Sequence, residues 1–300
     1  MTDQDTAAGP RNLPALLVGL RERRFTGAVT VSGTPGGTIH VRDGLVVAIH
    51  TPGAPAPDAL LLRSRRVGED EWNAALEAGR GDGRPDAALV ALGTIGAGEL
   101  DAVCRASVFD GAFAMSLSPS AEWTVDEAVP TPAFAADVGV EPQPLADETA
   151  RRMLLLSGLW GPLGEFAGSR IKPAPRVEMA RVPMVSRFHD VLSAANGRRG
   201  PRDIAFALGR GVYAVMLDLA RMHERRLVQR DVPSGAGPVP ILTARMPGDS
   251  GPAPDVDHAL LPRRSPGTHR PGPVPVVTNG QDQVAPGTPG GTTASRRTQP

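Results

Sequence analysis

The sequence predicts an α+β fold, with an N-terminal antiparallel β-meander, flanking helices and a helical bundle, followed by a mostly α-helical domain and a disordered tail. Three observations carry this prediction. Residues 25–50 contain three strand-like runs in succession, and residues 58–117 and 146–231 carry apolar residues at helical spacing. Residues 232–300 contain no Phe, Trp or Tyr and are dense in Pro and Gly, so they cannot bury enough apolar area to offset the entropy lost on ordering.

The composition suggests a chain divided into several segments, because 35 Gly and 31 Pro are too many for one compact fold of 300 residues. We expect a flexible leader over 1–11, an α+β domain over 12–129 with a helical repeat at 58–117, a Pro-rich linker over 130–145, a helical domain over 146–231 and a disordered tail over 232–300.

The first domain should begin with a helix over Leu13–Arg24, which has a leucine stripe. Strands Gly27–Val31, Thr38–Arg42 and Leu45–His50 follow. Asp43-Gly44 is a residue pair typical of a two-residue type I′ hairpin turn, because both turn positions need positive φ. With this turn, Val41 faces Val46, Arg42 faces Leu45, Ile39 faces Ala48 and His40 faces Val47, so that His40 and His50 lie on opposite faces of the sheet.

A repeat with a shift of 28 residues follows, in which Leu61–Leu76 aligns with Leu89–Cys104. Each copy should form two short helices that pack against the other copy. The expected core residues are Leu61, Leu62, Trp72, Leu76, Leu89, Val90, Leu100 and Val103. A short strand at Glu122–Asp126 could return to the sheet.

The helical domain should contain helices at Thr149–Leu159, Met184–Ala195, Pro201–Leu208 and Val212–Arg226, followed by a short strand at Leu227–Arg230. This succession, with Asn196-Gly197 ending one helix and Pro201 opening the next, resembles a winged-helix core. The chain turns to Pro and Gly after Arg230, so the wing is expected to be missing or truncated.

The N-terminal pattern resembles the PATAN family, named after the N-terminal domain of a cyanobacterial response regulator. The matching positions are Leu13–Leu20, Thr26-Gly27, Ile39–Val41, Asp43-Gly44 and Val46–Ala48, with helices following from Asp58. Thr26, Gly27, Asp43 and Gly44 are its structural motif residues. The resemblance covers roughly the first 130 residues and implies a protein-interaction module of bacterial signalling without known catalysis.

Charge and cysteine content favour a cytoplasmic protein. The 32 basic and 32 acidic residues give a formal net charge of zero, which weakens any whole-chain argument for nucleic acid or anionic membrane. Only Lys172 is a lysine, as expected from the GC-rich coding of a high-GC, actinobacterial-like organism. A single cysteine, Cys104, excludes a disulfide framework within the chain, and we expect neither a signal peptide nor a membrane-spanning run.

We expect no enzyme, no catalytic residue, no cofactor and no metal. The only lysine precedes Pro173, so no phosphate-binding Gly-x4-Gly-Lys motif exists. Gly248–Pro252 resembles the sequence around a serine-protease nucleophile but lies in the predicted disordered tail. The histidines are not clustered with other metal ligands, and Cys104 is expected to be a small buried hydrophobic residue.

Two functions therefore compete. The leading prediction is a non-enzymatic signalling or regulatory adaptor that binds a partner protein, with homodimerisation as a further expectation. The alternative is a transcriptional regulator that binds DNA through the winged-helix-like block. Its candidate contacts are Arg198, Arg199, Arg202, Arg210 and Tyr213, of which only Tyr213 suits a base edge. A solvated structural face remains the favoured interpretation of these arginines.

Overall fold

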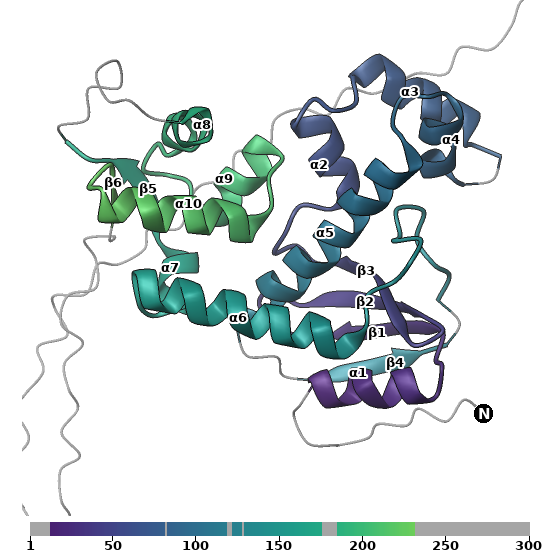
Figure 1. Ribbon diagram of the computed structural model, residues 1–300. Helices are drawn as coiled ribbons and strands as arrows, with labels where there is room; N and C mark the ends of the chain where they lie inside the picture. The colour runs from purple at the N-terminus through teal and green to yellow at the C-terminus, as the bar shows by residue number, and fades with distance from the viewer. Residues whose placement is uncertain (1–12, 82, 119–121, 128, 176–184, 232–300) are drawn as a thin grey trace, which may run out of the picture. The chain divides into compact units, whose positions relative to one another are not determined.

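The computed structural model describes residues 13–231 except 82, 119–121, 128 and 176–184. Within this part of the chain the fold is α+β with an N-terminal antiparallel sheet, as predicted. The sheet has four strands, and the described residues form ten helices (Figure 1). The expected leader and tail, and the Gly248–Pro252 motif, lie outside the described residues.

The sheet has the strand order β3-β2-β1-β4, in which β1 is Gly27–Val31, β2 Gly37–Arg42, β3 Leu45–His50 and β4 Trp123–Asp126. The strand expected near Glu122–Asp126 thus returns to the sheet, beside β1. One face of the sheet packs on α1 (Leu13–Glu22), α5 (Ala97–Ser116) and α6 (Pro142–Trp160). This core contains Val29, Val31, Ile39, Val41, Val46 and Ile49 from the strands. In β1 and β2 these core residues are two positions apart, because successive side chains of a strand point to opposite faces of the sheet.

The Asp43-Gly44 turn forms as predicted, with φ of 52° and 78° at its two residues. Val41 faces Val46 and Arg42 faces Leu45, but the next two predicted pairs are wrong. A register shift between His40 and Val41 pairs His40 with Ala48 and Ile39 with Ile49. A bulge adds one residue to one strand, so every side chain beyond it changes face.

The helical repeat forms α2 (Pro57–Arg63), α3 (Glu69–Ala78), α4 (Pro85–Ala91) and the start of α5. Leu61 and its repeat equivalent Leu89 are both fully buried in a shared core. Leu76 is exposed, contrary to the prediction, because Ala75 takes the position that faces this core.

The segment 130–145, expected as a linker, lies along the outer edge of β3. The Ala136 N–H donates to the Val47 carbonyl at 2.8 Å, and Val140 forms an isolated antiparallel bridge with Val46. Helix α6 already begins at Pro142, earlier than the expected start at Thr149. An N-terminal turn that contains Pro142 and Pro144 is tolerated because the first N–H groups of a helix have no intrahelical acceptor.

The remaining elements are α7 (Leu163–Gly168), β5 (Arg170–Pro173), α8 (Ser186–Ala194), α9 (Pro201–Leu208), α10 (Val212–Glu224) and β6 (Val228–Asp231). They share a large core that also takes in Phe113 and Ala114 of α5. Strands β5 and β6 pair antiparallel as a separate two-stranded sheet. The pattern of 146–231 did not predict β5, which is only four residues long.

Candidate functional site

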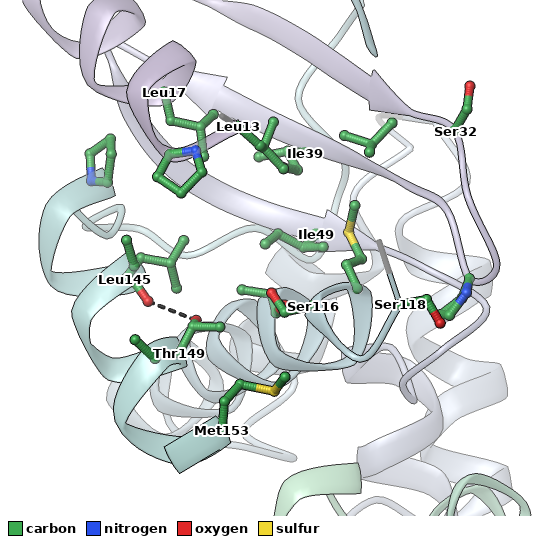
Figure 2. A pocket seen from close by; sticks show the side chains of 18 residues that line it. Leu13, Leu17, Ser32, Ile39, Ile49, Ser116, Ser118, Leu145, Thr149 and Met153 are labelled. Atoms are coloured by element: carbon green, nitrogen blue, oxygen red, sulfur yellow. Dashed lines mark hydrogen bonds between the residues drawn. The ribbon is translucent and has the colours of Figure 1, made fainter. Parts of the chain in front are cut away.

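An apolar pocket of about 430 Å³ opens between the sheet, α1, α5 and α6. Its size falls in the range of roughly 300–1,000 Å³ that is typical of ligand sites. Figure 2 shows Leu17 of α1 and Leu145 of α6 toward one end of the pocket, and Ser32 and Ser118 toward the other. Ile39 and Ile49 of the sheet form its floor.

Small side chains on two helices leave this space open. Helix α5 contributes Ala112 to the lining, and α6 contributes Ala146, Thr149 and Ala150. Larger residues at these positions would fill the gap against the sheet, as side chains do in a close-packed interior. The pocket is therefore a consequence of local sequence choices on α5 and α6 and not of a missing element.

The chemistry of the lining suits binding and offers no catalytic group. Among the described residues that line the pocket, none has a titratable side chain, and the hydroxyl groups come from Ser32, Ser116, Ser118 and Thr149. The Ser116 hydroxyl donates to the Ala112 carbonyl at 2.8 Å, and the Thr149 hydroxyl donates to the Leu145 carbonyl at 2.7 Å. A serine nucleophile needs an adjacent base, and the part of the lining that the structure describes contains none.

Exposed apolar residues continue from the pocket along α6. Ala146, Ala150 and Leu154 are spaced four residues apart and so lie on one stripe of the helix. Leu154 is 75% exposed, and its neighbour Leu155 is 41% exposed. Apolar surface of this kind beside a pocket is typical of a site for a protein partner.

The four motif residues of the PATAN resemblance lie together at the β2–β3 turn, where they have structural roles. The Asp43 N–H donates to the Thr26 hydroxyl at 2.9 Å, and the Gly44 N–H donates to the Phe25 carbonyl at 2.7 Å. A Cβ on Gly27 would lie 2.3 Å from the Asp126 carbonyl oxygen. These four residues hold β1 against the turn, and their contacts are with the chain itself, so we assign them a structural role.

The five candidate nucleic-acid contacts do not form one surface. Tyr213 packs against Phe113 of α5, with ring centroids 5.3 Å apart, and beneath the Arg152 guanidinium at 4.7 Å. Arg210 donates to the buried Asp218 carboxylate at 2.6 Å. By contrast, Arg198, Arg199 and Arg202 lie near one another in and just after the loop between α8 and α9.

A buried carboxylate that the sequence reasoning missed ties α10 to α5. Asp110 of α5 is 5% exposed and accepts the N–H groups of Val212 at 2.7 Å and Tyr213 at 2.9 Å. These are the first two residues of α10, whose N–H groups have no acceptor within the helix. Burial raises the pKa of Asp110, while these two bonds and Arg152 act in the opposite direction. The available signal was an Asp between Phe109 and Phe113 in an apolar helix.

His40 and His50 lie on the same face of the sheet, contrary to the prediction, because the bulge reverses the facing of Ala48 and His50. His40 Nε2 and His50 Nδ1 are 3.2 Å apart. Burial, followed by the effect of His50, lowers the pKa of His40 to about 4. No group of three or more metal-ligating side chains occurs among the described residues.

The Cys104 thiol and the lengths of the apolar helices complete the description. Burial, followed by the nearby Asp101 and Asp86, raises the pKa of the Cys104 thiol to about 12, so it remains a thiol at neutral pH. Over the described ranges, we find no helix with both the length and the apolar character that crossing a membrane requires.

In comparisons with protein-family models, with curated proteins and with solved structures, nothing matches this chain. The resemblance to the PATAN family therefore stays a prediction. The function must be argued from the geometry of the pocket and its surroundings.

Proposed function

We propose that this chain is a non-enzymatic adaptor of bacterial signalling that binds a partner protein. The partner places the apolar face of an amphipathic helix into the pocket between the sheet, α1, α5 and α6. The observation that carries this proposal is the continuity between an uncharged apolar pocket and the exposed Leu154. Binding of a helix in a groove uses apolar anchors at spacings of three and four residues.

A helical partner fits better than a small molecule. The stripe formed by Ala146, Ala150 and Leu154 extends along α6 for two helical turns, so a partner that follows it contacts the pocket and Leu154 together. A small ligand held inside the pocket alone would leave Leu154 in solvent. The α10 helix is not available for reading DNA bases from its N-terminal end, because Asp110 holds that end against α5.

The test selects amphipathic helical peptides from a displayed library on the full-length chain and measures their affinity by fluorescence anisotropy. We expect Ala150→Glu and Leu154→Glu to weaken the selected peptides at least about tenfold, which is about 1.4 kcal/mol, because each places a charge on the apolar contact. Leu92→Glu is the matched control, since Leu92 is 54% exposed at the C-terminal end of α4 and does not line the pocket.

Equal binding to all three variants would show that the selected peptides use another surface and would refute the proposal. A library that yields no binder to the wild-type chain would refute it as well. Circular dichroism of each variant checks that the fold is retained. Both pocket-side substitutions are at exposed positions, so we expect little change in the spectra.

A further inference from the structure

Two segments bring arginines together where the loop between α8 and α9 packs on β5. The Ile171 N–H donates to the Arg199 carbonyl at 3.0 Å, and the Gly197 N–H donates to the Ile171 carbonyl at 2.8 Å. A Cβ on Gly200 would lie 3.2 Å from the Ser169 carbonyl oxygen, so the loop lies directly on the start of β5. Arg170 is thereby close to the arginines of the loop.

Three of these arginines, Arg170, Arg198 and Arg202, have exposed side chains, and we call them the arginine surface. Among the side chains that the structure describes, a set that does not include Asp231 opposite Arg170 on β6, no acidic group lies at ion-pair distance from any of the three. Asp203, the acid nearest in sequence to Arg198 and Arg202, accepts the Gly200 N–H at 3.1 Å. Arg199 differs because it is half-buried and its guanidinium faces the Ala194 carbonyl at 3.5 Å.

We propose that the arginine surface binds the phosphate backbone of duplex nucleic acid. A guanidinium matches a phosphate with two parallel hydrogen bonds, and it stays charged at every physiological pH. Arg198 and Arg202 are four residues apart, which spans at most about 13 Å and is enough to face more than one phosphate of a strand.

The composition of the surface favours a duplex over other polyanions. Residues 170–173 and 196–202 include no aromatic side chain, and the half-buried Phe206 of α9 has the Arg202 guanidinium over its ring at 5.6 Å. Proteins that hold single strands instead stack the bases on exposed aromatic rings. Ile171, which lies between Arg170 and the loop, is fully buried, so it supplies no apolar anchor for a membrane surface.

Binding at this surface is independent of base sequence. The N-terminal end of α10, from which a winged-helix protein would read bases, is bonded to Asp110 and packed on α5. Phosphate contacts fix a protein on the duplex without carrying sequence information. The inference does not rest on the proposed adaptor function, since none of the three arginines lines the apolar pocket.

Counterion release sets the size of the expected effect. Three phosphate contacts predict a slope of about −2.7 in a plot of log K against log salt concentration, from about −0.9 for each contact. The affinity should then fall about 40-fold between about 50 and about 200 mM salt.

The experiment measures anisotropy of a labelled random-sequence DNA duplex with the full-length chain across this range of salt. The variant R170A/R198A/R202A should show a slope near zero. The variant R170K/R198K/R202K should keep most of the slope, because charge is retained, and it shows that the surface tolerates substitution. The control variant R23A/R24A/R65A removes three exposed arginines elsewhere, so it matches the change in net charge and should leave the slope unchanged.

Three results would overturn the inference. The first is a wild-type slope near zero. The second is an equal loss in the control variant, which would assign the effect to net charge alone. The third is tighter binding to a labelled single strand or to poly-glutamate than to the duplex, which would replace the duplex by another anionic partner.

Discussion

Asp110 offers the sharpest test of how α5 and α10 are held together. Its carboxylate accepts two backbone N–H groups at 2.7 and 2.9 Å, from a helix more than 100 residues away in the sequence. The perturbation is Asp110→Ala, with Asp110→Asn as the near-isosteric comparison. Both are made in the full-length chain.

The magnitude follows from the two bonds. A hydrogen bond to a charged group contributes about 1.5–3 kcal/mol, and loss of a helix N-cap typically costs about 1 kcal/mol and at most about 2. Burial of the carboxylate, which raises the pKa of Asp110, offsets part of this gain. We therefore expect Asp110→Ala to lower the free energy of unfolding by about 2 kcal/mol. Asp110→Asn keeps one acceptor oxygen and should lower it by about 1 kcal/mol.

Urea unfolding followed by circular dichroism measures the free energy of unfolding of both variants. A loss below about 0.5 kcal/mol for Asp110→Ala would refute this account, since that is the level of an ordinary surface substitution. Asp203→Ala is a useful comparison. It removes a single, exposed carboxylate bond to the Gly200 N–H at the start of α9 and should have the smaller effect.

Three further outcomes are expected. Gly44→Ala should destabilise the chain by about 1–3 kcal/mol in thermal unfolding, because φ is +78° and the new Cβ would meet the α1 backbone at 2.7 Å, whereas Gly98→Ala enters open space and should not. The wild-type chain should lose stability as the pH falls from 6.5 to about 4, because in this range His40 binds a proton in the unfolded state and stays neutral in the folded state. In the variant His40→Gln this loss should be absent from the pH profile of thermal unfolding. Hydrogen bonds from two arginines lower the pKa of Glu148 to about 2, so the wild-type chain should lose the stability that this carboxylate contributes as the pH falls from 4.5 toward 2. In the variant Glu148→Gln the free energy of unfolding should depend less on pH in this range.

The turn of the sheet could be predicted from sequence because its cause is local. Asp43-Gly44 needs only positive φ at two adjacent residues, and the composition of the pair supplies it. The bulge beyond it could not be predicted in this way. The Val47 carbonyl accepts from Ala136 and Val46 pairs with Val140, so the conformation of β3 depends on a segment about 90 residues away.

The pocket illustrates the same limit. Leu13, Leu17, Ile39 and Ile49 all had the periodicity of core residues, and they do face inward. Whether the space in front of them is filled depends on the small residues that α6 presents there. The first residues of α6, from Pro142, belong to a segment that was expected to be a linker, so the sequence did not predict that a helix faces the sheet there. Periodicity identifies an apolar face, but it does not say whether the opposing helix is close enough to cover it.

The position of Asp110 also bears on the choice between the two functions predicted from sequence. For α10 to read bases from its N-terminal end, Val212 and Tyr213 would have to leave the Asp110 carboxylate and expose Phe113, which is fully buried. Exposing Phe113 alone costs about 1.5–3 kcal/mol in addition to the two hydrogen bonds. Base contacts from Tyr213 would have to exceed this sum before they contributed any affinity. A mode that leaves α10 in place and uses only the exposed arginines avoids this cost, so any binding of DNA by this chain should be sensitive to salt and insensitive to sequence.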